Sequence, residues 1–209
     1  MMQKYAIRCA EARDIEAIMR VEHQSFAAGI AETQAVFAER LACAAQCNYV
    51  LLDSGAQSVC GYFTAEIWEA ARFDPALFSL GHSVREQHRP DGTTLYISSF
   101  ALLPEVRGTR IPRSALSVES LASKAGADTA QGEPTIGLAA LFFTTVLERI
   151  GAAFPQLERI VLLVHEEWHN ALALYEKYGF TPIQTLDRFA WFGGKRAFVY
   201  EKMISNKPL

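Results

Sequence analysis

Two strand-like runs joined by an apolar helix constrain this chain more than any other feature. The runs are TLYISSFALL at 94–103 and RIVLLVH at 159–165, and the second is almost wholly apolar. Such a run is typical of a strand that is buried on both faces of a sheet. A helix is predicted over 136–153, where large apolar side chains recur at helical spacing: Leu138, Leu141, Phe142, Val146 and Ile150. Strand, helix and strand in this order predict a crossover between two parallel strands.

The rest of the chain adds strands and helices around this crossover. The strand YAIRCA precedes two helical segments, 11–26 and 31–46, and the strands NYVLLD and SVCGYFTAEIW follow as a hairpin across SGAQ. In the polar connection 70–93, Asp74-Pro75 is a typical helix start. A last helix over 170–178 is expected to end at Gly179, and strands near PIQTLDRF and RAFVYEKMI flank an FGGK turn.

This order of elements predicts an α/β fold. Antiparallel hairpins come first and the crossover follows, so we expect a mixed, mostly antiparallel central sheet of about seven strands, flanked by helices. Neither an internal repeat nor a linker divides the 209 residues. The sequence therefore predicts a single domain over 1–209.

Composition argues against several classes of protein. The formal net charge of −3 and a pI near 6 argue against a protein that binds nucleic acid through phosphate contacts. No apolar run approaches the roughly 20 residues of a membrane span, and the N-terminal segment becomes charged too early for a signal peptide. The cysteines and histidines show no metal-ligand spacing. We therefore expect no metal, reduced thiols and a cytoplasmic location.

Two short motifs carry the chemistry. Arg107-Gly108 forms a turn after the first run, where free backbone N–H groups and a helix N-terminus suit an anion, and glycine lets a phosphate approach closely. In NALALYEKYGF, Tyr175 and Tyr178 lie three apart and share one side of a helix. Either motif alone is weak evidence, because Arg-Gly is commonly a plain turn and a helical tyrosine commonly belongs to the core.

The order of the motifs is more specific than each one. FALLPEVRG, an apolar helix, RIVLLV and NALALYEKYGF follow one another as in the GNAT N-acetyltransferase superfamily, and the chain resembles that superfamily from YAIRCAEARDIEAI to FVYEKMI. Within it, VEHQSF, EIWEAARFDPALFSLGHS and the strand leading to FALLPEVRG look most like the arylalkylamine (serotonin) N-acetyltransferases. This second resemblance is a hint about the subfamily and does not assign a substrate.

The resemblance implies acetyl-CoA as co-substrate and direct acyl transfer to an amine. Phe100, Ala101 and Leu102 match the strand that pairs with the pantetheine arm, where a backbone N–H of Leu102 or its neighbour would polarise the thioester carbonyl. Tyr175 matches the tyrosine that donates a proton to the leaving thiolate; a phenol, with an ordinary pKa near 10, suits that role because it stays protonated at neutral pH. The remaining cofactor-binding positions that the resemblance implies are Arg107, Gly108, Thr109, Gly137, Leu138 and Asn170.

The chain departs from the family in the phosphate loop. Arg110 and Pro112 stand where the Arg-Gly-x-Gly-x-Gly pattern has glycines. We interpret 110–134 as an insertion, after which Gly137 closes the loop at the helix start; the insertion is either a lid over CoA or a plain surface loop. The alternative alignment makes 112–124 the phosphate-loop helix. Arg110 or Arg113 would compensate for the lost glycines by reaching the nucleotide phosphates.

A second departure concerns the base that deprotonates the amine. The arylalkylamine enzymes carry a histidine pair on this strand, whereas this chain has Tyr96 and Ser98, which face the same side but are poor bases. Either water relays the proton through Ser98 or another base acts. The candidates are Glu66, Glu22 and His165. Aromatic residues expected on the acceptor side, or else in the core, are Phe26, Tyr62, Trp68 and Tyr96.

The sequence therefore predicts an acetyl-CoA-dependent N-acetyltransferase that acts on a primary amine, with a small arylalkylamine or polyamine-like acceptor as the first hypothesis. A protein N terminus or a lysine is the alternative acceptor and would need an open groove. A non-catalytic acyl-CoA binding or sensing module is the alternative from another class, although the retained Tyr175 argues against it. The oligomeric state stays open, although GNAT proteins are often homodimers.

Overall fold

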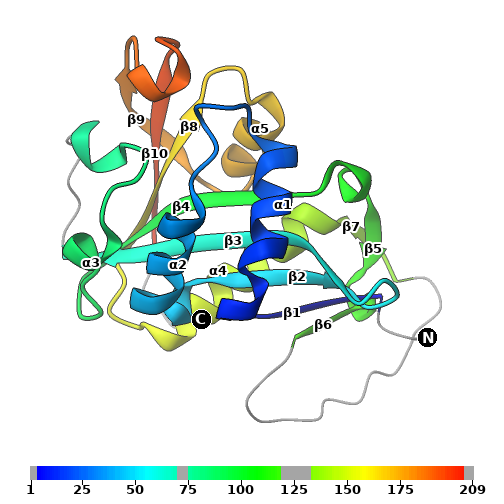
Figure 1. The fold of residues 1–209 in the computed structure, drawn as a ribbon. Helices are drawn as coiled ribbons and strands as arrows, with labels where there is room; N and C mark the ends of the chain where they lie inside the picture. Colours follow the sequence, from blue (N-terminus) through cyan, green and yellow to red (C-terminus); the bar gives the residue numbers. More distant parts are fainter. Residues whose placement is uncertain (1–3, 70–74, 119–132, 205–209) are drawn as a thin grey trace.

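The computed structural model describes residues 4–69, 75–118 and 133–204 (Figure 1). Its main sheet has eight strands in the order β6-β1-β2-β3-β4-β8-β10-β9. Two neighbouring pairs are parallel, β1 with β6 and β4 with β8, and the other pairs are antiparallel. The strands span Tyr5–Cys9 (β1), Tyr49–Asp53 (β2), Ser58–Trp68 (β3), Thr94–Leu102 (β4), Leu116–Val118 (β6), Arg159–His165 (β8), Thr181–Leu186 (β9) and Ala197–Met203 (β10).

The helices cover both faces of this sheet. They span Ile15–Ser25 (α1), Gln34–Cys43 (α2), Val84–Gln87 (α3), Leu138–Ala153 (α4) and His169–Lys177 (α5). Figure 1 shows α1 and α2 in front of the sheet and α4 behind it. The core therefore has two layers against the central strands, and Phe37 of α2 and Phe142 of α4 are both fully buried. The predicted α/β fold with a mixed, mostly antiparallel sheet is confirmed.

Local sequence explains where several helices begin and end. The Thr33 side chain accepts a hydrogen bond from the Val36 amide at the start of α2. After α5, Gly179 has a φ of 83°, and the Phe180 amide donates to the Tyr175 carbonyl across the turn. The predicted stop at Gly179 is confirmed. Of the expected start at Asp74-Pro75, Asp74 lies outside the described residues, while Pro75–Phe78 forms a single 3-10 turn.

The segment interpreted as an insertion supplies the strands that the sequence did not predict. It begins with β5 (Arg110–Pro112), which pairs with β7 (Thr135–Gly137) in a separate two-stranded sheet. Between them β6 joins the edge of the main sheet beside β1. The alternative helix over 112–124 is wrong for 112–118, which form a turn and a strand; residues 119–132 lie outside the described part. The helix predicted before the strand at 159–165 is α4.

The sheet opens between β4 and β8. β4 and β8 pair only from Thr94 with Arg159 to Ile97 with Leu162, after which no further pairs form between them. At the same point β4 carries a bulge, because Ile97 pairs with Ala65 and Ser99 with Thr64, which leaves Ser98 without a partner on β3. The C-terminal half of β4 is therefore paired on one side only.

In the described ranges, no helix is both long and apolar enough to cross a membrane.

Candidate active site

A cavity of about 760 Å³ lies where β4 and β8 separate. Its walls come from α1, β4, β8, α5, the turn after β4, and the segments that follow β3 and β9. It contains nine of the twelve residues predicted for the site: Tyr96, Ser98, Phe100, Ala101, Leu102, Arg107, Gly108, Asn170 and Tyr175. The other three, Thr109, Gly137 and Leu138, do not line it. The topology thus gathers residues from 96 to 175 around one space.

We call the residues Ser98–Leu102 with Tyr175 the β4–β8 opening. The Leu103 amide donates to Cys60 O on β3, so the peptide groups of Leu102 point the opposite way, since successive groups alternate along a strand. Leu102 O accepts from Arg107 Nε at 2.9 Å and from Ser25 Oγ at 3.3 Å. On the β8 side, Leu102 O is therefore held by two side chains, whereas the Leu102 amide has no strand partner and is available to a ligand.

The turn after β4 has a glycine where one is needed. Gly108 has a φ of 74°, and a Cβ there would meet nothing within 4 Å. The turn leads to the start of α4, because the Leu138 amide donates to Thr109 O at 2.8 Å. That bond occupies the backbone amide of Leu138, one of the residues that the sequence predicts for cofactor binding. The helix N-terminus nevertheless lies beside Gly108, and Ala139 of its first turn lines the cavity.

The arginines near this turn are engaged with protein groups. Arg107 Nη2 donates to Ser25 Oγ at 2.9 Å, so its guanidinium ties β4 to α1. Arg110 donates to Thr135 Oγ1 and Thr135 O across the β5–β7 pair, and Arg113 lies 3.5 Å from Glu148. Neither Arg110 nor Arg113 lines the cavity.

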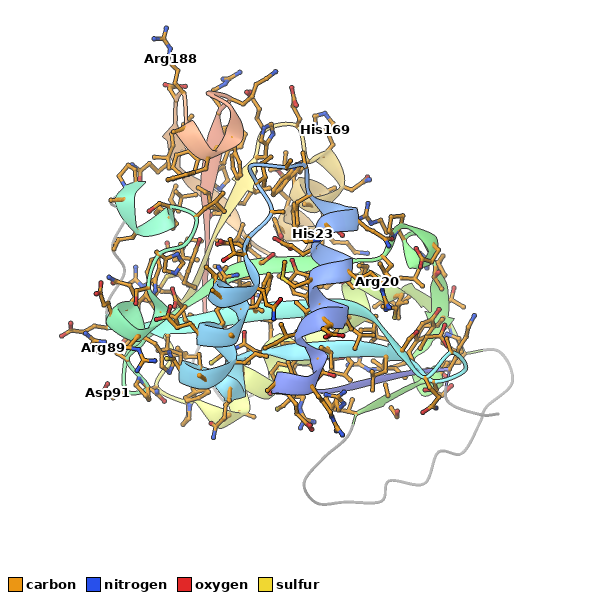
Figure 2. The ribbon with its side chains drawn as sticks, in the orientation of Figure 1. Arg20, His23, Arg89, Asp91, His169 and Arg188 are labelled. Atoms are coloured by element: carbon orange, nitrogen blue, oxygen red, sulfur yellow. The ribbon has the colours of Figure 1, made fainter. Side chains whose placement is uncertain are left out.

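Tyr175 is placed to act on a ligand in the β4–β8 opening. It is 8% exposed, and its ring contacts Phe143 and Phe180. Burial raises its pKa above the ordinary tyrosine value. Among the described residues its hydroxyl has no hydrogen-bond partner, although the side chain lines the cavity. Asn170 lies one turn earlier on α5, and Figure 2 shows the neighbouring His169 at the start of that helix.

A hydrogen-bonded chain connects β4 to Glu22 of α1. Ser99 Oγ lies 2.7 Å from Tyr62 Oη, and that hydroxyl donates to Glu22 Oε2. Glu22 Oε1 accepts from the Glu32 amide at 2.8 Å. Burial raises the pKa of Glu22, and the hydrogen bonds from Tyr62 and the Glu32 amide oppose that shift without cancelling it. Glu22 lines the cavity and is 1% exposed, so a carboxylate with raised proton affinity stands beside β4.

The bulge explains why two successive serines reach the same face. Ser98 Oγ lies 3.0 Å from Thr64 Oγ1, while Ser99 Oγ contacts Tyr62. Thr64 and Tyr62 are two apart on β3 and share a face, so Ser98 and Ser99 point to that face together. The resemblance to the arylalkylamine enzymes predicted Ser98 for the site, and neither it nor the alternation along the strand pointed to Ser99. No local sequence pattern marks the bulge.

Two ion pairs, Arg40 with Glu32 and His82 with Glu66, lie near Glu22. We call these five residues the charged cluster: Glu22, Glu32, Arg40, Glu66 and His82. Arg40 Nη2 donates to Glu32 Oε1 at 2.9 Å, and the Gly81 amide also donates to the Glu32 carboxylate. His82 Nε2 lies 2.5 Å from Glu66 Oε1, and His82 Nδ1 faces Ser79 O at 3.1 Å. Burial lowers the pKa of His82, but Glu66 outweighs it, so the pKa lies above its ordinary value.

The cluster separates the three candidate bases. Glu66 is 1% exposed, does not line the cavity, and holds Trp68 Nε1 as well as His82. His165 is stacked on Trp168, accepts from the Glu167 amide, and also lies outside the lining. Only Glu22 of the three lines the cavity.

Aromatic rings form much of the remaining wall. Tyr96 stacks on Trp68 at 4.3 Å and meets Phe78 edge-on at 5.5 Å. Of the aromatic residues expected on the acceptor side, Phe26 and Tyr96 line the cavity, while Tyr62 and Trp68 stand behind it. Trp191, which is 41% exposed, lies at the border with the solvent. Arg188, after β9, extends away from the molecule (Figure 2).

In the ranges that the structure describes, no three His, Cys, Asp or Glu side chains gather as a metal site.

Comparison with known proteins identifies the fold. The sequence matches no family model and no curated protein. Among solved structures, it is similar to the loading GNATL domain of CurA from Lyngbya majuscula (12% identity, TM-score 0.71, 97% of this chain and 99% of that one). It is also similar to the GphF GNAT-like decarboxylase in complex with isobutyryl-CoA (14%, 0.67, 94% and 98%) and to Arabidopsis thaliana NAA60 with a bisubstrate analogue (15%, 0.65, 97% and 99%).

The chain has the GNAT fold. The likenesses extend over nearly the whole of each chain. At these identities they establish the architecture and leave the reaction to be argued from the site. The expected relation to the GNAT superfamily is thus confirmed for the fold, and the closer relation to arylalkylamine N-acetyltransferases stays a prediction.

Proposed function

We propose that the protein is an acetyl-CoA-dependent N-acetyltransferase that transfers the acetyl group directly to a small primary amine. The observation that carries this proposal is the pairing of two proton-transfer groups across one cavity. Tyr175 presents an unpartnered hydroxyl in the β4–β8 opening, and the Ser99–Tyr62–Glu22 chain stands on the α1 side. Acyl transfer to an amine needs both a proton acceptor and a proton donor.

The cofactor fits the β4–β8 opening. The backbone groups of Phe100 and the Leu102 amide, which face away from β3, suit the amide groups of the pantetheine arm, as expected from the sequence. Gly108 and the start of α4 suit the pyrophosphate, because the turn is open and the helix N-terminus favours an anion. Similar folds have been solved with isobutyryl-CoA and with a bisubstrate analogue, which supports the assignment.

In the reaction, the amine nitrogen forms a bond to the acetyl carbonyl carbon and the carbon–sulfur bond breaks. The proton lost by the amine passes to Ser99 Oγ, whose own proton moves to Tyr62 Oη and on to Glu22 Oε2. Tyr175 gives its proton to the departing thiolate. The raised pKa of Glu22 makes it a stronger base than an ordinary carboxylate, provided that it is ionised at the working pH.

The walls support a small acceptor rather than a polypeptide. Phe78, Leu80 and His82 line the cavity from the segment after β3, and Ile30 lines it from the connection between α1 and α2. A protein N terminus or a lysine would need an open groove at this place. The aromatic wall and Glu22 fit the arylalkylamine or polyamine-like acceptor that the sequence suggests, and this finer assignment stays a prediction, as do the homodimer and the cytoplasmic location.

Thiol release from acetyl-CoA tests the proposal. The purified chain is titrated with acetyl-CoA by calorimetry and then assayed with a panel of amines, with mass spectrometry of the products. Binding together with acetylation of a small amine is the expected result. Binding without thiol release from any amine or peptide would favour the acyl-CoA sensing module, and absence of binding would remove the cofactor assignment.

A further inference from the structure

Arg40 is the most unusual polar side chain around the cavity. It is 2% exposed, lies on α2 and lines the cavity. Only Nη2 has a partner, Glu32 Oε1; in the described part of the chain, Nε and Nη1 are buried without any hydrogen-bond acceptor. A buried guanidinium with unmet donors is costly, since each unmade bond forfeits a charge-assisted interaction. Such a group is expected to be completed by a ligand.

The neighbours of Arg40 are already occupied. Glu32 accepts from Arg40 and from the Gly81 amide. Both ring nitrogens of His82 face acceptors, Glu66 and Ser79 O, so His82 carries a proton on each and adds a second cation. Glu66 Oε2 is also buried without a partner among the described residues, but Glu66 does not line the cavity, so the capacity left unfilled on the cavity wall itself is donor capacity. It calls for an oxygen acceptor, and although Arg40 and His82 are each already paired with a glutamate, a carboxylate would make stronger, charge-assisted bonds to the free guanidinium donors than a neutral oxygen.

We propose that the acceptor amine also bears a carboxylate and that Arg40 binds it, so the substrate is an amino acid. This inference rests on the proposed function and names the class of its acceptor. Glu22 and Arg40 are joined through a single residue, because the Glu32 amide donates to Glu22 and the Glu32 carboxylate accepts from Arg40. The base and the guanidinium therefore share Glu32 as a neighbour on the cavity wall, so one small molecule bearing both an amine and a carboxylate could engage both sides of this wall.

The charges support a zwitterion over a polyamine. The amine lies at Ser99, on the side of the Glu22 carboxylate, and Arg40 receives the carboxylate, so each end of the substrate meets a group of suitable charge. A polyamine would place a second cation against Arg40 and His82, which is unfavourable at short range in a buried site. An aromatic side chain on the amino acid would then lie against the wall formed by Phe78 and Tyr96.

Matched substrate pairs test this inference on the unaltered protein. Phenylalanine is compared with phenylethylamine and tryptophan with tryptamine, together with the methyl ester of each amino acid, which keeps the amine and removes the charge. We expect kcat/KM for the amino acids to exceed that of both analogues by about 100-fold, because the analogues leave Arg40 unpaired. Equal or better turnover of the amines would overturn the inference and leave the proposed function intact.

An Arg40→Lys variant links the preference to the guanidinium. It keeps the charge beside Glu32 but loses donors, so the preference for the carboxylate should fall to about tenfold or less, mainly through KM. Thermal unfolding checks that the variant is folded, and the substrate pairs remain decisive if it is not. If Arg40→Lys changes the use of malonyl-CoA against acetyl-CoA and leaves the amine preference unchanged, the carboxylate belongs to the acyl group and the inference is wrong. Absence of thiol release with every amine would instead remove the proposed function.

Discussion

The two sides of the cavity are built in different ways. The β4–β8 opening is made largely of backbone: a strand that loses its partner, a glycine turn, and a helix start. The charged cluster is made of side chains from α1, α2, β3 and the segment after β3. A backbone site tolerates many sequences, whereas a buried network of charges depends on every member. We therefore expect the first side to define the cofactor and the second to define the acceptor.

The largest effect is expected at Tyr175. In the β4–β8 opening, which is otherwise made largely of backbone, protonation of the leaving thiolate depends on this one side-chain hydroxyl. Tyr175→Phe should lower kcat by about 100-fold or more, because the thiolate loses its proton donor. Binding of CoA should stay within about twofold, since the ring still packs on Phe143 and Phe180. Stopped assays and calorimetry measure the two quantities. An unchanged kcat would mean that solvent protonates the thiolate and that the Tyr175 hydroxyl is not needed for catalysis.

Glu22→Gln probes the charged cluster and should lower kcat/KM by about 100-fold. In the native protein, activity should rise with pH as Glu22 ionises, through a pKa above the ordinary glutamate value, because burial raises it. This acid limb should be absent in the variant. Glu16→Gln, an exposed position on the same helix, serves as the control and should keep the native profile. Survival of the acid limb in Glu22→Gln would assign the base elsewhere.

A smaller effect is expected at Gly108. Gly108→Ala should weaken CoA binding by about tenfold, because the new methyl group occupies the open side of the turn where a phosphate would approach. The left-handed backbone should also cost about 1 kcal/mol of stability. Gly194→Ala is a matched control, since Gly194 has a φ of 79° and equally open surroundings. A similar loss of CoA binding in both variants would mean that backbone strain, and not blocking of the phosphate, causes the effect of Gly108→Ala.

The smallest effect is expected at Arg107, which connects β4 in the β4–β8 opening to α1 on the opposite side of the cavity. Arg107→Met removes the bonds from the Arg107 guanidinium to Leu102 O of β4 and to Ser25 Oγ of α1, and the free energy of unfolding should fall by about 1–2 kcal/mol. Urea titration measures the change. Arg188→Met, at an exposed position away from the cavity, should leave stability unaltered. If both variants unfold alike, Arg107 acts on the ligand alone and the two sides are independent.

The sequence by itself determined the crossover and the order of motifs along it. The apolar periodicity of 136–153 and the run at 159–165 became α4 and β8, and Gly179 ended α5 as its type predicts. These features depend on neighbours along the chain. The strand Leu116–Val118 was missed because its few residues find a partner only at the sheet edge, beside β1.

Only the tertiary structure decided the acceptor side. Nothing near Glu22, Arg40 or His82 in the sequence marks them as neighbours, and Glu66 and His165 were equally plausible as the base until the cavity lining separated them from Glu22. Ser99 joined the site through a bulge that depends on how β3 and β4 pair. Local sequence encodes hydrogen bonds between near neighbours, but the partners of a buried charge come from distant segments and are known only once the core has closed.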